Sequence, residues 1–138
     1  MKLMIVEDSA IVRPRLAEMV CDLDLVKVLA MASDGEEALR LFRVQQPDVV
    51  LLDLHLPGRS GLETLRQMRI ENQSNVVIVL TSETQPEFRA ASLKAGADFF
   101  LSKSDDHGRI PEILRDLTCG RTGRVIRPEN GVISSERT

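Results

Sequence analysis

The chain has 138 residues, a length typical of one domain, and its 43% hydrophobic and 28% charged residues are usual for a globular protein that buries a core. With 18 basic and 21 acidic side chains, the formal net charge is -3, which gives no electrostatic reason to expect direct binding to nucleic acid or to an anionic membrane. These values favour a protein or a small molecule as the partner.

The amino terminus and the cysteines bear on the location of the protein. The first residues, MKLMIVEDSA, lack the apolar segment of a signal peptide, and no window approaches the roughly 18 consecutive apolar residues of a membrane span. Cys21 and Cys119 are far apart in the sequence and form no C-x-x-C motif. We therefore expect a cytoplasmic protein with both thiols free and no membrane partner.

Short apolar stretches alternate with segments of helical periodicity. The stretches are rich in β-branched or aromatic residues and too short for helices, which predicts β-strands. The predicted strands cover residues 3–6, 26–32, 48–53, 75–80 and 97–102. The alternation predicts an α/β fold, a doubly wound five-stranded parallel sheet, over residues 1–118. Residues 119–138 show little periodicity and predict a flexible tail, with a short hairpin or a docking segment as alternatives.

Local signals at the predicted helix starts are mostly clear. Ser60 with Glu63, and Thr84 with Glu87, have the spacing of a capping box, in which each side chain binds the backbone N–H of the other residue. Pro14 does not fit a regular first helix, because it removes one backbone hydrogen bond. We expect that helix to be bent or to begin late.

Polar side chains fall at the carboxyl ends of four of the predicted strands. Glu7 and Asp8 follow the first strand, Asp53 ends the third, Thr81 follows the fourth, and Lys103 follows the fifth. In a doubly wound sheet functional residues gather at this edge, so we expect these side chains to converge. Carboxylates at close range raise the pKa of one another unless a cation joins them. A ligand set made only of oxygen suits Mg²⁺.

The composition of this cluster favours phosphoryl transfer. A carboxylate can act as a nucleophile toward phosphorus and form an aspartyl phosphate, provided that the charge on the phosphoryl oxygens is neutralised. Mg²⁺, the Lys103 ammonium and the Thr81 hydroxyl would each meet one phosphoryl oxygen. Asp53 is then the acceptor. Each of these side chains alone is more commonly a helix cap, a backbone-bonded hydroxyl or a surface charge, and only the combination carries the hypothesis.

Four motifs carry a resemblance to a known family. They are VEDSAIVR (6–13), VVLLDLHLPGRSGLE (49–63), VIVLTS (77–82) and KAGADFFLSKS (94–104). In this order and at strand ends, they resemble the receiver domain of two-component response regulators, a family that includes the single-domain chemotaxis regulator. The resemblance covers residues 2 to about 118. It implies the (βα)5 flavodoxin-like fold and Mg²⁺-dependent phosphorylation of Asp53.

The resemblance also implies roles for individual residues around Asp53. Asp8 and Asp53 would bind Mg²⁺ directly, together with the main-chain carbonyl of His55, and Glu7 would act largely through water. Phe100 matches the switch aromatic residue of the family. Thr81 carries the switch hydroxyl of the family. The rotamer of Phe100 is expected to change when this hydroxyl moves toward the phosphoryl group.

The implied partners follow from the same family. A histidine kinase or a histidine phosphotransferase would donate the phosphoryl group, and the surface of residues 84–118 would change its affinity for a downstream output protein or for a second copy of the chain. Only 20 mostly polar residues follow residue 118, with no helix-turn-helix. We therefore expect a stand-alone regulator that catalyses only its own phosphorylation and autodephosphorylation, and no other enzymatic reaction.

Two positions near the site differ from the family or vary within it. Ser104 follows Lys103 where receiver domains usually have proline, which implies a less rigidly held lysine. His55 and Glu83 occupy positions through which the family tunes autodephosphorylation. The imidazole would either shield the acyl phosphate from water or donate a hydrogen bond to it.

Two other functions compete with this interpretation. A phosphatase of the haloacid-dehalogenase kind places a second Asp two residues after its nucleophile, where this chain has His55, and 138 residues leave no room for a cap domain. A degenerate receiver used only for protein docking is the second alternative. The complete set of site residues argues against it.

Overall fold

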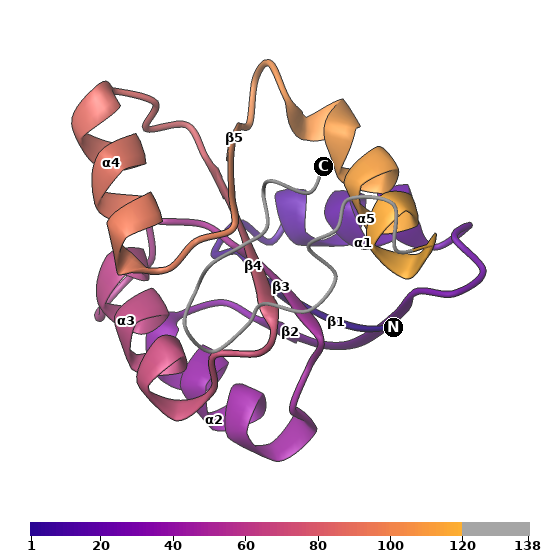
Figure 1. Cartoon of the computed structure of the whole chain (residues 1–138), viewed down its shortest axis with the longest axis horizontal. Helices are drawn as coiled ribbons and strands as arrows, with labels where there is room; N and C mark the ends of the chain where they lie inside the picture. Colours follow the sequence, from indigo (N-terminus) through magenta and orange to yellow (C-terminus); the bar gives the residue numbers. More distant parts are fainter. Residues whose placement is uncertain (120–138) are drawn as a thin grey trace.

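The computed structural model describes residues 1–119, apart from the side chain of His107. A single parallel sheet lies at the centre, with the strand order β2-β1-β3-β4-β5 (Figure 1). The strands are β1 (Lys2–Val6), β2 (Lys27–Ala32), β3 (Val49–Leu52), β4 (Val76–Thr81) and β5 (Phe99–Ser102). The helices are α1 (Val12–Val20), α2 (Gly35–Gln45), α3 (Gly61–Glu71), α4 (Pro86–Ala95) and α5 (Ile110–Cys119), with a short 3-10 turn, η1 (His107–Arg109), before α5.

The predicted fold class is confirmed. Every pair of neighbouring strands is parallel, and helices connect the strands in sequence. All residues of β3 and β4 are buried, because helices cover both faces of the sheet. The helix α5 runs through Cys119, and the rest of the predicted tail, from residue 120 on, lies outside the described residues.

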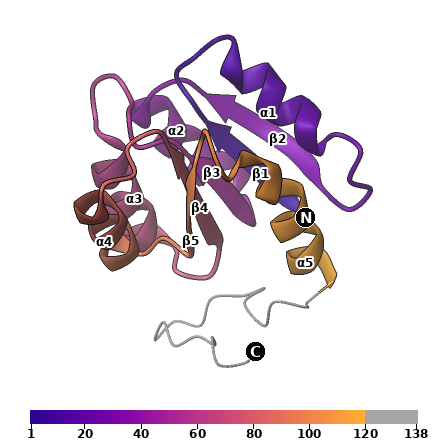
Figure 2. The ribbon, with the colours of Figure 1, turned by 90° about the horizontal axis from the view of Figure 1, so that it is seen from above.

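Alternate residues of each strand enter two separate apolar layers. Ile5 and Leu51 belong to the layer under α1 and α5, whereas Met4 and Val50 belong to the layer under α2 and α3. Figure 2 shows α1 and α5 on one side of the sheet and α2, α3 and α4 on the other. The burial of both faces fixes the register of the strands, and so fixes which residues end at the same edge.

The first helix begins late, as predicted from Pro14. Ser9 lies in the turn before α1, where its hydroxyl accepts hydrogen bonds from the N–H groups of Ile11 and Val12 at 3.3 Å and 3.1 Å. Pro14 therefore falls in the first turn of α1, where a backbone N–H has no partner within the helix. The proline costs the helix no internal hydrogen bond at this position.

One predicted capping box is present and the other is wrong. Ser60 and Glu63 bind each other's backbone N–H at the start of α3. At α4, however, the N-cap is Gln85 and the first helical residue is Pro86, with no side-chain cap. Proline favours the first position of a helix because its φ is preset and its missing N–H would have no partner there. Because of this preference, α4 begins at Pro86 and not directly after Thr84.

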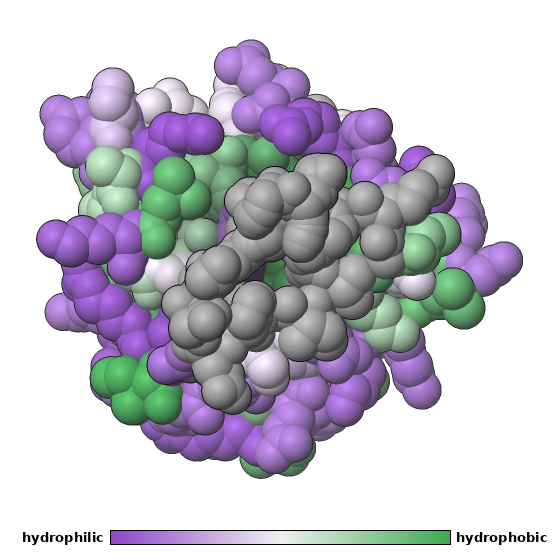
Figure 3. Space-filling model, viewed as in Figure 1, coloured by the Kyte–Doolittle hydropathy of each residue, from purple (hydrophilic) through white to green (hydrophobic). Residues whose placement is uncertain are grey.

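The hydropathy of one face of the molecule can be followed in Figure 3. The face seen in Figure 3 is largely hydrophilic outside the atoms drawn in grey, with scattered hydrophobic side chains. None of the helices in residues 1–119 has the length and apolar character that a membrane crossing needs. Cys21 and Cys119 are exposed and free, as predicted.

Candidate functional site

The sheet places Glu7 and Asp53 side by side at its carboxyl edge. The Glu7 N–H donates to the carbonyl oxygen of Ala32 at 2.9 Å, and the Asp53 N–H donates to that of Val6 at 3.0 Å. These bonds continue the parallel pairing of β1 with β2 and with β3 by one residue. Glu7 is 1% exposed and Asp53 is 4% exposed, so both residues are buried at the edge of the sheet.

Three carboxylates form a group at this edge. Glu7, Asp8 and Asp53 each offer an oxygen, and these oxygens lie within 4.8 Å of one another. Burial raises the pKa of Glu7, and the negative charge of Asp53 raises it further. A cation among these oxygens would offset both effects. The donor set is made of oxygen alone and includes an exposed member, Asp8, so it fits Mg²⁺, which keeps several of its waters.

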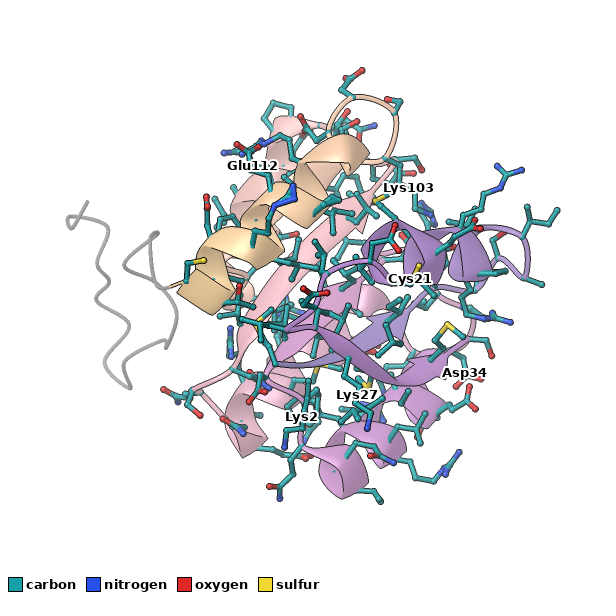
Figure 4. The ribbon with its side chains drawn as sticks, turned by 90° about the vertical axis from the view of Figure 1, so that its right-hand side faces the viewer. Lys2, Cys21, Lys27, Asp34, Lys103 and Glu112 are labelled. Atoms are coloured by element: carbon teal, nitrogen blue, oxygen red, sulfur yellow. The ribbon has the colours of Figure 1, made fainter. Side chains whose placement is uncertain are left out.

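The Lys103 ammonium places a positive charge beside two of these carboxylates. Its Nζ lies 2.8 Å from Glu7 Oε1 and 2.9 Å from Asp53 Oδ2. Burial lowers the pKa of Lys103, but the hydrogen bonds with Glu7 and Asp53 outweigh burial, and the pKa lies above its usual value. Lys2 and Lys27 are the first residues of β1 and β2, and in Figure 4 Lys103 lies toward the opposite end of the sheet from them.

Thr81 ends β4 next to Lys103. The Lys103 N–H donates to the Thr81 carbonyl oxygen at 2.9 Å, and Thr81 pairs with Ser102 in the sheet. Thr81 is fully buried, and its Oγ1 accepts a hydrogen bond from the Glu83 N–H at 3.0 Å. The hydroxyl thus holds the start of the loop between β4 and α4.

Phe99 and Phe100 lie on opposite faces of β5, as strand geometry requires. Phe99 packs against the layer under α1 and α5, and Phe100 packs against the layer under α2 and α3, each only partly buried. The guanidinium carbon of Arg89 lies 5.7 Å from the centre of the Phe100 ring, within the range of a cation–π contact. The ring therefore connects α4 with the strand that leads to Lys103.

A hydrogen-bonded pair, His55 and Glu83, joins the two loops beside the carboxylates. Nε2 of His55 contacts Oε2 of Glu83, and the His55 N–H donates to Asp53 Oδ1 at 3.1 Å. The hydrogen bond with Glu83 raises the pKa of His55. The pair thereby connects the loop after β3 with the loop after β4 at the mouth of the site.

Sequence reasoning did not identify Gly61 as a site residue. A Cβ on Gly61 would lie 2.4 Å from the Leu54 Cα and 2.5 Å from the carbonyl oxygen of Asp53, distances that no side chain tolerates. The Gly61 N–H donates to the Leu54 carbonyl oxygen at 3.0 Å. Glycine at the start of α3 thus lets the helix approach the loop that holds Asp53. The Gly directly after the Ser60 cap was the available signal.

Arg13 was also missed. Its Nη1 donates to the carbonyl oxygens of Glu7 and Asp8 at 2.9 Å and 3.3 Å. The side chain, from the first turn of α1, thereby holds the backbone that carries two of the three carboxylates. An arginine on the helix directly after an acidic pair was the signal in the sequence.

The model of the family described as "Response regulator receiver domain" matches residues 3–115. The response regulator GacA of Pseudomonas syringae is 32% identical over 93% of this chain and 59% of its own length. The nitrate/nitrite response regulator NarL of Escherichia coli is 29% identical over 86% of this chain and 55% of its own length. The chain thus spans little more than half of these curated relatives.

Solved structures show the same likeness in three dimensions. A LuxR-family two-component response regulator from Aurantimonas sp. has 31% identity and a TM-score of 0.80, and the match covers 87% of this chain and 86% of that one. The signal receiver domain of a NarL response regulator from Mycobacterium tuberculosis has 27% identity and a TM-score of 0.79, covering 87% and 97%. The family match, the relatives and the fold agree that the chain belongs to the response regulator receiver domain family of two-component signalling.

Proposed function

We propose that Asp53 accepts a phosphoryl group from a histidine kinase or a histidine phosphotransferase, in a reaction that requires Mg²⁺. The observation that supports this most directly is the contact of the Lys103 ammonium with Asp53 Oδ2 at 2.9 Å, beside the carboxylates of Glu7 and Asp8. The arrangement combines a nucleophile, a fixed positive charge and a set of metal ligands at one edge of the sheet.

In the proposed reaction, a carboxylate oxygen of Asp53 forms a bond to phosphorus. The bond between phosphorus and the donor nitrogen breaks, and the nitrogen keeps the electron pair. The Lys103 ammonium, which contacts Asp53 Oδ2, would neutralise charge on one phosphoryl oxygen. Mg²⁺ held by Asp8, Asp53 and the His55 carbonyl, with Glu7 acting through water, would supply the same neutralisation at a second oxygen.

The proposed output begins at Thr81. Phosphorylation adds roughly -1.5 to -2 charges and three acceptor oxygens beside its hydroxyl. The hydroxyl leaves the Glu83 N–H and binds the phosphoryl group, and Phe100 rotates into the space that opens. The surface of α4, β5 and α5 then changes its affinity for an output protein or for a second copy of the chain.

Two parts of this proposal concern the location of the protein and its domain organisation. The free thiols of Cys21 and Cys119 support a cytoplasmic location. The stand-alone organisation stays a prediction, because the curated relatives extend well beyond the matched segment. The proposed phosphoacceptor chemistry does not depend on it.

The test is intact-protein mass spectrometry after incubation with acetyl phosphate and Mg²⁺. We expect one added phosphoryl group that is absent without metal and absent from Asp53→Asn. Asp24→Asn, which removes an exposed carboxylate at the opposite end of the sheet, is the matched control and should be phosphorylated like the wild type.

A wild type that takes no phosphoryl group would contradict the proposal. Beryllofluoride, a stable mimic of the acyl phosphate, distinguishes a short-lived adduct from an inactive site. Failure to bind it as well would favour a receiver that acts only by docking to a protein.

A further inference from the structure

The segment after β5 forms a turn that is closed by two hydrogen bonds between Ser102 and Asp106. The Asp106 N–H donates to the Ser102 carbonyl oxygen at 2.8 Å, and Asp106 Oδ2 accepts a hydrogen bond from the Ser102 N–H at 3.0 Å. Both main-chain polar groups of Ser102 are therefore bound to Asp106. Lys103 lies inside the turn that these two bonds close.

The Ser102 side chain binds the two residues that follow Lys103 in the sequence. Its Oγ accepts from the N–H groups of Ser104 and Asp105, each at 3.3 Å, and lies 3.1 Å from Ser104 Oγ. A proline at position 104 could not make the first of these bonds, because it has no N–H. Ser102 is only 8% exposed, so water competes little for its hydroxyl.

These bonds fix the backbone from which the Lys103 side chain extends. A lysine side chain is long and flexible, and its ammonium reaches one position reproducibly only when its starting point and its contacts are both fixed. The contacts are the carboxylates of Glu7 and Asp53, at 2.8 Å and 2.9 Å. The starting point is held by the Thr81 carbonyl on one side and by the turn on the other.

We propose that Ser102 and Asp106 are positioning residues for Lys103, whose hydrogen-bonded turn directs the ammonium toward Asp53 and Glu7. The relevance of this turn to phosphoryl transfer rests on the proposed function of Asp53. Its effect on the position of the ammonium does not, and can be measured without any reaction.

A purely structural role of Asp106 would have different consequences. Its carbonyl accepts from the Arg109 N–H at 2.8 Å, as expected of a residue that precedes a helical turn. If Asp106 served only to start η1, its replacement would lower the melting temperature but leave the ammonium in place. The position of the Lys103 ammonium is therefore the readout that separates the two roles.

The experiment records the ammonium signal of Lys103 by ¹H–¹⁵N NMR in ¹⁵N-labelled protein, well below the melting temperature and assigned by its loss in Lys103→Arg. We expect a protected signal in the wild type, and its loss in Asp106→Ala and Ser102→Ala. Asp106→Asn should restore it, because the amide oxygen can still accept from the Ser102 N–H. Asp105→Ala, which removes an exposed carboxylate one residue away, is the matched control and should leave the signal unchanged.

The same variants are then phosphorylated with acetyl phosphate and Mg²⁺. We expect the initial rate to fall roughly 10-fold in Asp106→Ala, because small misplacements of a group at a reacting centre cost up to about 100-fold. Asp106→Asn and Asp105→Ala should react at the wild-type rate.

The outcomes separate this inference from the proposed function. An ammonium signal retained in Asp106→Ala, lost equally in Asp105→Ala, or absent from the wild type would overturn the positioning role. A wild type that shows the signal but takes no phosphoryl group would contradict the proposed function alone, while the signals of the variants would still decide the positioning role.

Discussion

The Nζ of Lys103 donates a hydrogen bond to Asp53 Oδ2 at 2.9 Å, although the two residues are 50 positions apart in the sequence. Each residue directly follows a strand, β5 and β3, and β4 lies between these two strands in the sheet. The contact thus spans one strand of the sheet, a distance that the long lysine side chain covers. It places a fixed positive charge on the carboxylate that we propose as the phosphoryl acceptor.

Replacing Lys103 tests the importance of that charge for the reaction. We expect Lys103→Met to slow phosphorylation by acetyl phosphate by about 100-fold or more, because a preorganised group that neutralises developing charge typically contributes that much. Initial rates measured by intact-protein mass spectrometry check the prediction. Lys94→Met, which removes an exposed ammonium from α4, should react at the wild-type rate. Equal rates for the two variants would show that the Lys103 ammonium takes no part in the reaction.

Gly61 tests the close approach of α3 to the loop that holds Asp53. The added methyl group in Gly61→Ala would overlap the backbone of Leu54 and the carbonyl oxygen of Asp53. We expect a loss of about 1–3 kcal/mol in the free energy of unfolding, as for other overpacked sites, together with slower phosphorylation. Urea denaturation measures the first effect. Gly108→Ala is the control, because a Cβ there meets nothing within 4 Å. Equal stability of the two variants would contradict the prediction.

The hydrogen-bonded pair of His55 and Glu83 bears on the lifetime of the phosphorylated form. The pair spans the two loops next to Asp53, so we expect it to limit the approach of water, and Glu83→Ala to lose its phosphoryl group several times faster than the wild type. The decay of the phosphorylated protein after removal of acetyl phosphate gives the rate. Glu87→Ala, on the exposed surface of α4, should decay like the wild type. Slower decay in Glu83→Ala would mean that the pair assists hydrolysis.

A buried ion pair joins Arg69 of α3 to Asp98, outside the site. Arg69 Nη2 lies 2.8 Å from Asp98 Oδ2, with the two side chains 9% and 3% exposed, and Arg69 Nε also donates to the carbonyl oxygen of Gly96 at 2.9 Å. Arg69→Met would leave the Asp98 carboxylate buried without this cation, which typically costs about 3–5 kcal/mol. Urea denaturation should show this loss. The exposed Arg66→Met should be close to the wild type, and a similar value for both would contradict the prediction.

An ion pair between Arg43 of α2 and Glu71 of α3, with Arg43 Nη2 2.7 Å from Glu71 Oε2, should make stability depend on pH. Hydrogen bonds from Arg43, and then from Gln67, lower the pKa of Glu71 below its ordinary value of 4.5. The folded state therefore favours the ionised form, and the stabilisation is present above pH 4.5 and is lost as the pH falls through the lowered pKa.

Glu71→Gln should thus have a slightly lower melting temperature than the wild type at neutral pH, and the difference should vanish in acid. Thermal unfolding followed by circular dichroism over a series of pH values measures it. Arg43→Met should show the same convergence. A difference between Glu71→Gln and the wild type that persisted unchanged in strong acid would rule out this origin.

Local patterns in the sequence predicted most of the fold, because they reflect interactions between near neighbours. The apolar runs gave the five strands, and the Ser60 and Glu63 spacing gave the start of α3. The start of α4 was missed because two local preferences competed there. Proline at position 86 has a fixed φ and no N–H, and it prevailed over the capping pattern at Thr84.

The sequence by itself determined which polar residues end the strands, and a parallel sheet necessarily brings strand ends to one edge. Only the tertiary structure decided which of their atoms meet. Lys103 binds Glu7 as well as Asp53, His55 pairs with Glu83, and Gly61 packs on the Asp53 loop. These contacts depend on strand register, side-chain reach and backbone packing between segments far apart in the chain, and no local pattern encodes such distances.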